Sequence, residues 1–353
     1  MVPLAPASIL PRAAPRLVPM PRPDPALPKK AGRAEDPRDP LEGRDLFAIV
    51  GPTATGKSAL GLAVAERAGA EIVSLDSMLV YRGMDVGTAK PTTEERARVP
   101  HHLVDVVDPP ERYDVQRFLV DVRARLEQLP KERRVLFVGG TAFFLKVLLD
   151  GLFDGPPVDL ELRQRLQARL AEEGGGRLHA ELERVDPRSA ARIHANDSKR
   201  LIRALEVFEQ TGKCLSEWQQ EWGWHGAAKP ARPREQRLVA LDVLTDDLDE
   251  RIRRRVRTML ENGWIEEVAR IHCTCGFGPT SIQALGYAQV LDLVESRITR
   301  EQAEEMIAVR TRQFARRQRT WYRKFEGMSW VQLTARGFGD HHVTDILRGF
   351  GWD

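Results

Sequence analysis

The stretch Gly51-Pro-Thr-Ala-Thr-Gly-Lys-Ser58 decides how this chain folds. An apolar run at residues 46–50 precedes it, and a helical pattern at residues 59–65 follows it. A glycine-rich loop between a strand and a helix is the setting in which this spacing binds phosphate. The glycines let successive backbone N–H groups converge on an anion, and the helix adds the positive end of its dipole. The pattern predicts a phosphate-binding loop formed by Gly51, Pro52, Thr53, Ala54, Thr55, Gly56, Lys57 and Ser58.

Two side chains of this loop add chemistry to the backbone. Lys57 supplies a positive charge for an outer phosphate, and the hydroxyl of Ser58 can hold a magnesium ion. The sequence therefore predicts Mg²⁺ as a cofactor, with Ser58 as a ligand. The phosphorylated molecule itself stays open at this point, because nucleoside triphosphates are only the commonest ligands of such loops.

Strand and helix patterns alternate around this loop. A helix is expected at residues 114–129, and strands are expected at residues 71–75, 102–107, 135–138 and 237–244. Such alternation predicts an α/β fold with a doubly wound parallel sheet, in which ligands bind at the carboxyl ends of the strands. Ser58, Asp76 and Thr141 should therefore surround one crevice.

Composition divides the chain into segments. Residues 1–43 are rich in proline, with scattered Arg and Lys and no contiguous apolar core, so this segment is expected to be disordered. Helical patterns without strands fill residues 157–224, which predicts a helical insertion. The catalytic core is then expected at residues 44–156 and 225–333, and residues 334–353 are expected to be a tail.

A long helix near the C-terminus carries an unusual charge pattern. It opens with a capping box at Thr299-Arg-Glu-Gln302. One helical stripe follows, made of Ile307, Thr311, Phe314, Gln318, Trp321 and Phe325. Seven basic residues and no acidic residue lie between positions 310 and 324. The natural partner of such a field is a phosphate backbone, and the competing interpretation is a solvated face that complements the helix dipole.

Composition also limits the environment of the protein. The net charge of +3 over 353 residues does not by itself indicate nucleic acid. Three cysteines are too few for a disulfide framework and lack the second Cys/His pair of a zinc site. They indicate a reducing compartment, so we expect a cytoplasmic protein. No run of 18 apolar residues is present, so we expect no membrane association.

Asp76 closes the second expected strand next to the phosphate loop. It could hold magnesium, as a carboxylate of a nucleoside triphosphatase does, or act as a general base. It could also cap a turn. The strand at residues 135–138 ends in Gly139-Gly140 and not in an acid, which weakens the triphosphatase interpretation.

Further motifs stand outside the loop. They are Asp76-Ser-Met-Leu-Val-Tyr-Arg-Gly-Met-Asp-Val-Gly-Thr-Ala-Lys-Pro91, His101-His-Leu-Val-Asp105, Gly139-Gly-Thr141, Lys199-Arg-Leu-Ile-Arg-Ala-Leu-Glu206, Leu285-Gly-Tyr287 and Thr311-Arg-Gln-Phe-Ala-Arg-Arg-Gln-Arg-Thr-Trp-Tyr-Arg323. Together with the loop they resemble the tRNA dimethylallyltransferases, in order from residue 46 to residue 325. The loop alone is shared with many folds, whereas the runs at 76–91 and 311–323 are far more specific.

The resemblance implies transfer of a dimethylallyl group from dimethylallyl diphosphate. The acceptor is the exocyclic amine of the adenosine just 3′ to the anticodon, in tRNAs that read codons beginning with U. The implied fold is similar to the P-loop kinases, with a helical insertion that grips the tRNA. Asp76 would accept the amine proton, Thr53 would contact the leaving diphosphate, and Arg255 would add charge there or lie on a solvated face. The implied partners are the tRNA anticodon stem-loop and dimethylallyl diphosphate, and we expect a monomer.

The resemblance also implies a path for the tRNA. The residues along it are Asp76, Ser77, Met78, Leu79, Thr141, Arg163, Lys199, Arg200, Leu201, Ile202, Arg203, Gln283, Ala284, Leu285, Gly286, Tyr287, Ala288, Arg316, Arg317, Gln318, Arg319, Thr320, Trp321, Tyr322 and Arg323. Splayed bases stack on aromatic rings and arginine planes. Trp321 also lies on the apolar stripe, so a place in the core is the competing interpretation. The bases at 199–203 could equally form an exposed helix face.

The sequence departs from the family in two places. Ala142-Phe143-Phe144 stands where Gly-Leu-Tyr is usual, and Ala288-Gln289 stands where Lys-Glu or Arg-Gln is usual.

The alternative functions are a small-molecule P-loop kinase, an isopentenyltransferase of free adenine nucleotide, and an RNA-binding protein without catalysis. The first two have no use for the basic helix, and the intact Lys57, Ser58 and Asp76 argue against the third.

Overall fold

The computed structural model of the chain describes residues 41, 43–152, 155–220, 235–334 and 336–353. Nearly all of the segment expected to be disordered lies outside the described residues, as do residues 221–224 of the expected insertion. Within the described part of the chain, no helix has both the length and the apolar character that a membrane span needs.

A six-stranded sheet with all neighbours parallel forms the centre of the described chain, in the order β3-β2-β4-β1-β5-β6. The strands are β1 (Leu46–Val50), β2 (Glu71–Ser74), β3 (His101–His102), β4 (Val135–Gly139), β5 (Gln236–Val243) and β6 (Met328–Leu333). In this register Val50 lies beside Gly139, and Ser74 lies beside Val138. The carboxyl ends of β1, β2 and β4 therefore meet at the same end of the sheet. The predicted α/β class and parallel sheet are confirmed.

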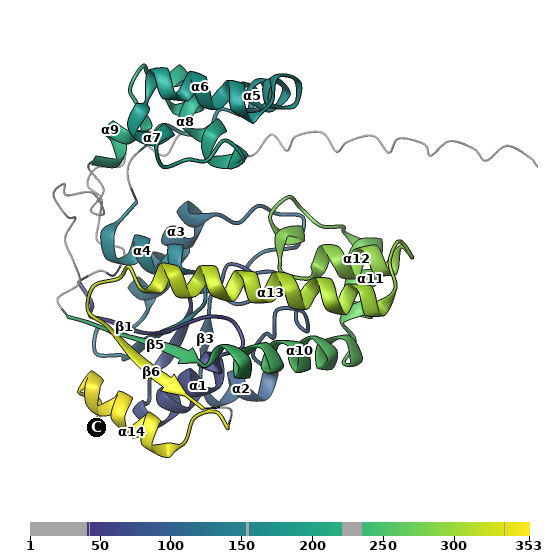
Figure 1. Cartoon of the computed structure of the whole chain (residues 1–353). Helices are drawn as coiled ribbons and strands as arrows, with labels where there is room; N and C mark the ends of the chain where they lie inside the picture. The colour runs from purple at the N-terminus through teal and green to yellow at the C-terminus, as the bar shows by residue number, and fades with distance from the viewer. Residues whose placement is uncertain (1–40, 42, 153–154, 221–234, 335) are drawn as a thin grey trace, which may run out of the picture. The chain divides into compact units, whose positions relative to one another are not determined.

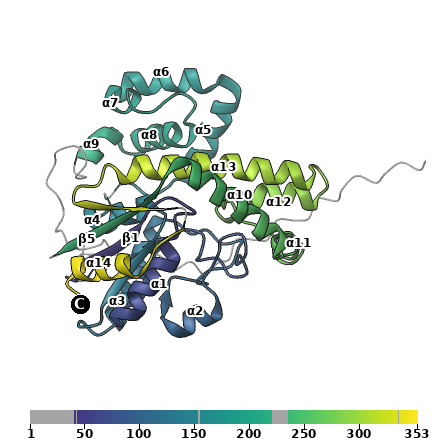
Figure 2. The same cartoon turned by 60° about the horizontal axis from the view of Figure 1, so that its bottom comes forward.

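Helices lie on both sides of this sheet. They are α1 (Lys57–Ala68), α2 (Thr93–Arg98), α3 (Val115–Gln128), α4 (Ala142–Asp150), α5 (Leu160–Glu173), α6 (Gly175–Val185), α7 (Pro187–Ala190), α8 (Ser198–Thr211), α9 (Leu215–Gln220), α10 (Thr245–Glu261), α11 (Trp264–Thr274), α12 (Tyr287–Val294), α13 (Arg300–Tyr322) and α14 (Asp340–Phe350), with a 3-10 turn η2 (Ser281–Gln283). Figure 1 shows their order along the chain, and Figure 2 shows α1 and α14 on one side of the sheet and α13 on the other.

The phosphate loop leaves the sheet through a tight turn. All five residues of β1 are buried. Gly51 follows with φ +146°, and a Cβ there would lie 2.7 Å from the carbonyl oxygen of Leu241. Gly139, at the end of β4, comes equally close to Leu75, since a Cβ there would lie 2.3 Å from its carbonyl oxygen. Both positions therefore require glycine, and they bring three strand ends close together.

Helices α5 to α9 form a hydrophobic cluster of their own. All of its buried members lie between residues 162 and 215, and Leu178, Leu182 and Leu201 are fully buried in it. Asp159 and Asp197 accept backbone hydrogen bonds at the starts of α5 and α8, as capping residues do. The amphipathic patterns seen in the sequence thus have a common apolar interior.

The structure corrects two of the sequence-based expectations. The strand expected at residues 102–107 is only the two-residue β3, because Leu103 (φ +59°) and Asp105 (φ +58°) adopt left-handed conformations that end a strand. Residues 334–353 are not a simple tail, since they contain α14. The ring of Trp352 lies 4.6 Å from that of Phe47 in β1, and Arg134 lies over its face.

Candidate active site

Two cavities adjoin the phosphate loop. The first, of about 620 Å³, is lined by Asp76, by Thr53, and by side chains of α10 and α13; we name it the Asp76 cavity. The second, of about 1090 Å³, is lined by residues 54–56 of the loop and by Arg251, Arg254 and Arg336; we name it the Arg254 cavity. Arg255 and Met259 line both cavities. These two residues of α10 therefore lie between the two cavities.

The phosphate loop is held in shape by its own polar groups. The hydroxyl of Thr55 donates to the carbonyl oxygen of Pro52 at 2.9 Å, and the ammonium of Lys57 donates to the same oxygen at 3.3 Å. Ala54 and Gly56 have positive φ angles of 65° and 92°. Among the residues that the structure describes, no side chain hydrogen-bonds to the N-terminus of α1. Its first N–H groups are therefore free to bind an anion.

Lys57, Asp76 and Arg255 interact electrostatically beside the phosphate loop. Burial lowers the pKa of Lys57 to about 8, Asp76 opposes this shift, and Arg255 adds to it. Burial also lowers the pKa of Arg255, again opposed by Asp76. Two desolvated cations therefore lie close to one carboxylate. A bound anion would stabilise both cations, which is the electrostatic character of a phosphate site.

Asp76 lies two residues after the end of β2, and its carboxylate is fixed. Its Oδ1 accepts the N–H of Met78 at 2.9 Å, and its own N–H donates to the hydroxyl of Ser74 at 3.2 Å. The next residue is tied to the turn after β4, because the N–H of Ser77 donates to the hydroxyl of Thr141 at 3.1 Å. Of the three residues expected around one crevice, Asp76 and Thr141 line the Asp76 cavity, whereas Ser58 is not among the residues that line either cavity.

The described residues contain no group of three or more His, Cys, Asp or Glu side chains that could hold a metal ion. Ser58 is exposed in the first turn of α1. A single hydroxyl such as that of Ser58 suits Mg²⁺ when substrate phosphates and water supply the other ligands, as is common for this ion. The donor set fits magnesium carried in with a diphosphate better than a site built from protein alone.

The Asp76 cavity gathers many of the residues predicted from the sequence. The predicted residues that line it are Thr53, Asp76, Ser77, Met78, Thr141, Arg255, Gln283, Ala284, Leu285, Arg317 and Gln318. The sequence reasoning did not assign Met259, Trp264 and Ile307 to a site, although they line its apolar part. Ile307 belonged to the predicted stripe, so the helical period was a usable signal. Trp264 had none.

Helix α13 has two chemically different faces. Gln318 and Tyr322 are buried, and Trp321 is partly buried against the core. The guanidinium of Arg319 pairs with Asp242 at 2.6 Å and donates to the carbonyl oxygen of Val243. The opposite face is exposed and consists of Arg316, Arg317, Thr320 and Arg323. Only this second face offers side chains to a large partner.

Several residues predicted along the tRNA path are occupied by protein contacts. Arg163 and Arg203 both pair with the fully buried carboxylate of Glu206, at 2.6 Å and 3.1 Å. Leu201, Ile202, Ala284, Gly286 and Tyr287 are buried, whereas Leu79, Leu285 and Ala288 are partly buried. Lys199 donates to Gln283 at 2.7 Å, and Arg200 pairs with Asp197 at 3.2 Å. Lys199, Arg200 and Gln283 stay at the surface.

A second group of residues without an assignment from sequence fixes one wall of the Asp76 cavity. The buried carboxylate of Glu267, in the first turn of α11, accepts the N–H groups of Asp85, Val86 and Gly87. It also accepts the hydroxyl of Tyr287 at 2.6 Å. Gly87 lines the cavity, so this carboxylate positions part of its wall.

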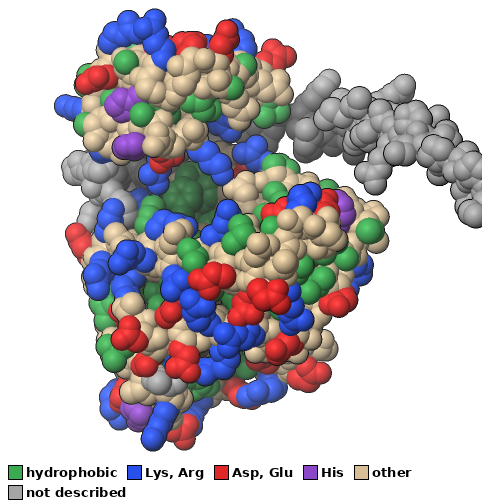
Figure 3. All heavy atoms as spheres, turned by 45° about the vertical axis from the view of Figure 1, so that its right-hand side comes forward, with side chains coloured by type: hydrophobic (Ala, Val, Ile, Leu, Met, Phe, Trp, Pro, Cys, Tyr) green, Lys and Arg blue, Asp and Glu red, His purple; other side chains and the backbone are tan. Residues whose placement is uncertain are grey.

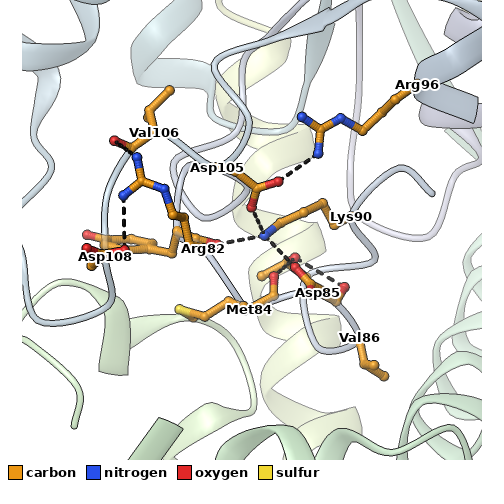
Figure 4. A network of polar contacts seen from close by, with 12 residues as sticks. Arg82, Met84, Asp85, Val86, Lys90, Arg96, Asp105, Val106 and Asp108 are labelled. Atoms are coloured by element: carbon orange, nitrogen blue, oxygen red, sulfur yellow. Dashed lines mark hydrogen bonds and ion pairs between the residues drawn. The ribbon is translucent and has the colours of Figure 1, made fainter. Parts of the chain in front are cut away.

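Lys90 holds the same segment from the other side (Figure 4). Its ammonium lies 2.6 Å from each of three oxygens, which belong to the carboxylates of Asp85 and Asp105 and to the carbonyl of Tyr81. Arg96 completes the network through the other oxygen of Asp105, at 2.7 Å. The left-handed turn at Asp105 that ended β3 therefore places this carboxylate against Lys90.

Comparison with known proteins identifies the family. A family profile described as IPP transferase matches residues 79–325, and one described as isopentenyl transferase matches residues 44–104. The chain belongs to the IPP transferase family. It is 42% identical over 302 residues to the tRNA dimethylallyltransferase of Methylococcus capsulatus, covering 84% of this chain and 95% of that protein. With the enzyme of the same description from Geobacter sulfurreducens the identity is 41% over 313 residues, covering 87% and 97%.

Solved structures give the same assignment. The tRNA isopentenylpyrophosphate transferase of Bacillus halodurans superimposes with a TM-score of 0.63 and 34% identity, over 87% of this chain and 96% of that one. A eukaryotic dimethylallyltransferase described as acting on tRNA superimposes with a TM-score of 0.68 and 26% identity, over 83% and 74%. The IPP transferase family thus accounts for the loop, the sheet and α13 together.

Proposed function

We propose that this protein transfers a dimethylallyl group from dimethylallyl diphosphate to a tRNA. The acceptor is the exocyclic amine of the adenosine 3′-adjacent to the anticodon, in tRNAs that read codons beginning with U, and diphosphate is released. The observation that carries the proposal is that the carboxylate of Asp76 shares one cavity with Thr53 and Arg255, directly beside a phosphate loop. Membership of the IPP transferase family supports the same reaction.

The leaving diphosphate would lie against the phosphate loop. Uncapped N–H groups at the start of α1, the ammonium of Lys57 and the guanidinium of Arg255 supply positive charge at this place. Such preorganised donors stabilise the charge that develops on a departing diphosphate. Magnesium, held by Ser58 and phosphate oxygens, would neutralise part of that charge when bound. Thr53 would contact the diphosphate from the Asp76 cavity.

The acceptor amine would approach from the Asp76 cavity. A new bond forms between the amine nitrogen and the first carbon of the dimethylallyl group, while the bond from that carbon to the diphosphate oxygen breaks. The amine loses one proton, which passes to the carboxylate of Asp76. The hydrogen bond from Met78 to Asp76 leaves the second carboxylate oxygen able to accept it.

The adenine must leave its stack to reach this carboxylate. Phe314, Arg310 and Arg317 line the cavity, and the guanidinium of Arg317 lies 5.9 Å from the ring of Phe314. Figure 3 shows one face of the molecule, on which Lys and Arg side chains gather beside a hollow. Such a surface suits the phosphate backbone of an anticodon stem-loop. The tRNA path predicted from the resemblance, apart from Gln318, is kept as part of this proposal, with Arg316, Arg317, Thr320 and Arg323 as its exposed residues in and directly after α13.

The finer structural assignments form part of the same proposal. The sheet order and the loop support a P-loop kinase-like core at residues 44–156 and 225–333, and the separate apolar cluster of α5 to α9 supports a helical insertion at residues 157–224. We further propose that the protein acts in the cytoplasm as a monomer.

A small-molecule kinase is the main alternative, since the loop alone would suit ATP. The decisive experiment incubates the protein with dimethylallyl diphosphate labelled in the prenyl group and with unmodified tRNA. AMP and ATP serve as alternative acceptors, and a tRNA with guanosine in place of the adenosine 3′ to the anticodon serves as the matched control. We expect label only in the adenosine-containing tRNA. Consumption of ATP without labelling of tRNA would refute the proposal.

A further inference from the structure

The side chain of Gln318 connects the basic helix to the phosphate loop. It is only 6% exposed, although its neighbours Arg316 and Arg317 lie at the surface. Its Oε1 accepts the N–H of Thr53 at 2.9 Å, and its Nε2 donates to the carbonyl oxygen of Gly140 at 2.7 Å. Both ends of the amide are thus used inside the protein.

These two contacts join two strand ends. Thr53 belongs to the loop after β1, and Gly140 belongs to the turn after β4. A Cβ at Gly140 would lie 2.7 Å from the Gln318 nitrogen and 3.5 Å from the ammonium of Lys57. The amide therefore sits beside the cation of the phosphate site, in a space that fits it closely. It fixes how far the loop stands from the turn that carries Thr141.

The loop depends on such an external contact. The left-handed conformation of Ala54 is costly for a residue with a side chain and persists only where the surroundings enforce it. Within the loop, the side chains of Thr55 and Lys57 both donate to the carbonyl oxygen of Pro52 and not to Thr53 or Ala54. Without Gln318 the N–H of Thr53 and the carbonyl of Gly140 would lose their partners. The loop would then have to reorganise before it could bind a diphosphate.

We propose that Gln318 is a positioning residue for the diphosphate of the donor and makes no contact with RNA. Arg316 and Arg317, on the other face of the same helical turn, are exposed. Helix α13 would thus carry both the side chains offered to tRNA and the side chain that holds the donor-binding loop in place. This inference rests on the proposed function and departs from the tRNA contact that the sequence resemblance implied for Gln318.

The test separates donor binding from RNA binding. In Gln318→Met the side chain keeps its length and loses both hydrogen bonds. Binding of inorganic diphosphate with magnesium is measured by calorimetry, and binding of unmodified tRNA is measured by fluorescence anisotropy. We expect the Kd for diphosphate and the KM for dimethylallyl diphosphate to rise at least tenfold, while the Kd for tRNA changes less than twofold. Gln332→Met, at an exposed position of β6, is the matched control and should change none of these values.

A second variant guards against loss of folding. Gln318→Glu keeps the acceptor for the N–H of Thr53 but loses the donor to Gly140 and adds a negative charge beside Lys57, so its affinity for diphosphate should fall at least as far as that of Gln318→Met, again with less than a twofold change in the Kd for tRNA. A tenfold weaker tRNA affinity with unchanged diphosphate binding would overturn the proposal, because Gln318 would then read RNA. Unchanged affinities for both ligands would also overturn it. A wild-type protein that binds diphosphate and prenylates no tRNA would count against the proposed function and leave this test valid.

Discussion

Replacing Glu267 by glutamine tests the buried carboxylate that holds one wall of the Asp76 cavity. The residue is 3% exposed and accepts four hydrogen bonds, from the N–H groups of Asp85, Val86 and Gly87 and from the hydroxyl of Tyr287. The single carbonyl oxygen of a glutamine can keep the two donors at 2.7 Å, Asp85 and Val86. Its amide nitrogen would then face the other two. The Tyr287 hydroxyl can rotate and accept, but the N–H of Gly87 cannot.

The expected cost follows from this count. One buried N–H without an acceptor costs about 1–3 kcal/mol, and hydrogen bonds to a neutral acceptor are about 1 kcal/mol weaker than those to a charged one. We therefore expect Glu267→Gln to lower the free energy of unfolding by about 3 kcal/mol. At about 2 °C per kcal/mol for a chain of this size, the melting temperature should fall by about 6 °C.

Thermal unfolding followed by circular dichroism measures this change. Glu266→Gln is the matched control, because it removes the same charge from the same turn of α11 at an exposed side chain. Such a surface change should stay within about 0.5 kcal/mol. If the two variants melted at the same temperature, the four hydrogen bonds to Glu267 would not stabilise the folded protein by the expected amount.

Three further predictions concern catalysis and binding. Asp76→Asn keeps the acceptor for Met78 and removes the base, so transfer should fall about 10²–10⁴-fold with unchanged tRNA affinity; turnover within tenfold of the wild type would exclude Asp76 as the base. Because the pKa of Lys57 is lowered to about 8, its charge is present below that pH and lost above it, and kcat/KM for the donor should fall as the pH rises through about 8. In Lys57→Arg this step should disappear, and its persistence would assign the titration to another group. Replacing Arg316 and Arg317 by alanine should weaken tRNA binding and make its salt dependence less steep by about 1–2 units of slope, whereas Arg348→Ala on α14 should not; an unchanged slope would place the pair away from RNA.

The phosphate loop and the parallel sheet were predictable because their causes are local. Glycine spacing, the apolar run before it and the helical period after it all lie within residues 46–65. The capping box at Thr299 and Gln302 has the same local character, and the structure confirms it. Position at the strand ends then brings Asp76 and Thr141 together without further information.

The site partners were not predictable, because they lie far away in sequence. Arg163 meets Glu206 across 43 positions, and Thr53 meets Gln318 across 265. A run of arginines shows positive charge and does not show which of its members are neutralised inside the protein. Arg319 and Arg316 are three positions apart, yet Arg319 is paired with Asp242 and Arg316 is exposed.

The helix α14 was missed although a local signal existed. Val343, Ile346, Leu347 and Phe350 are buried at helical spacing, so the period was readable in the sequence. The family resemblance ends near residue 325 and gives no guide to residues 334–353, for which the sequence analysis expects only a tail. The shortened β3 is different, since nothing local to Leu103 or Asp105 announces a left-handed backbone.

The packing of the C-terminal residues affects how the protein should be produced. A fragment ending near residue 325 would lack β6 and α14, remove the aromatic partner of Phe47 and leave β5 as an open sheet edge. Unpaired edges of this kind recruit other strands, so such a fragment should aggregate when expressed. Trp352, directly before Asp353, is buried, so an affinity tag fused directly after residue 353 should be joined through a spacer.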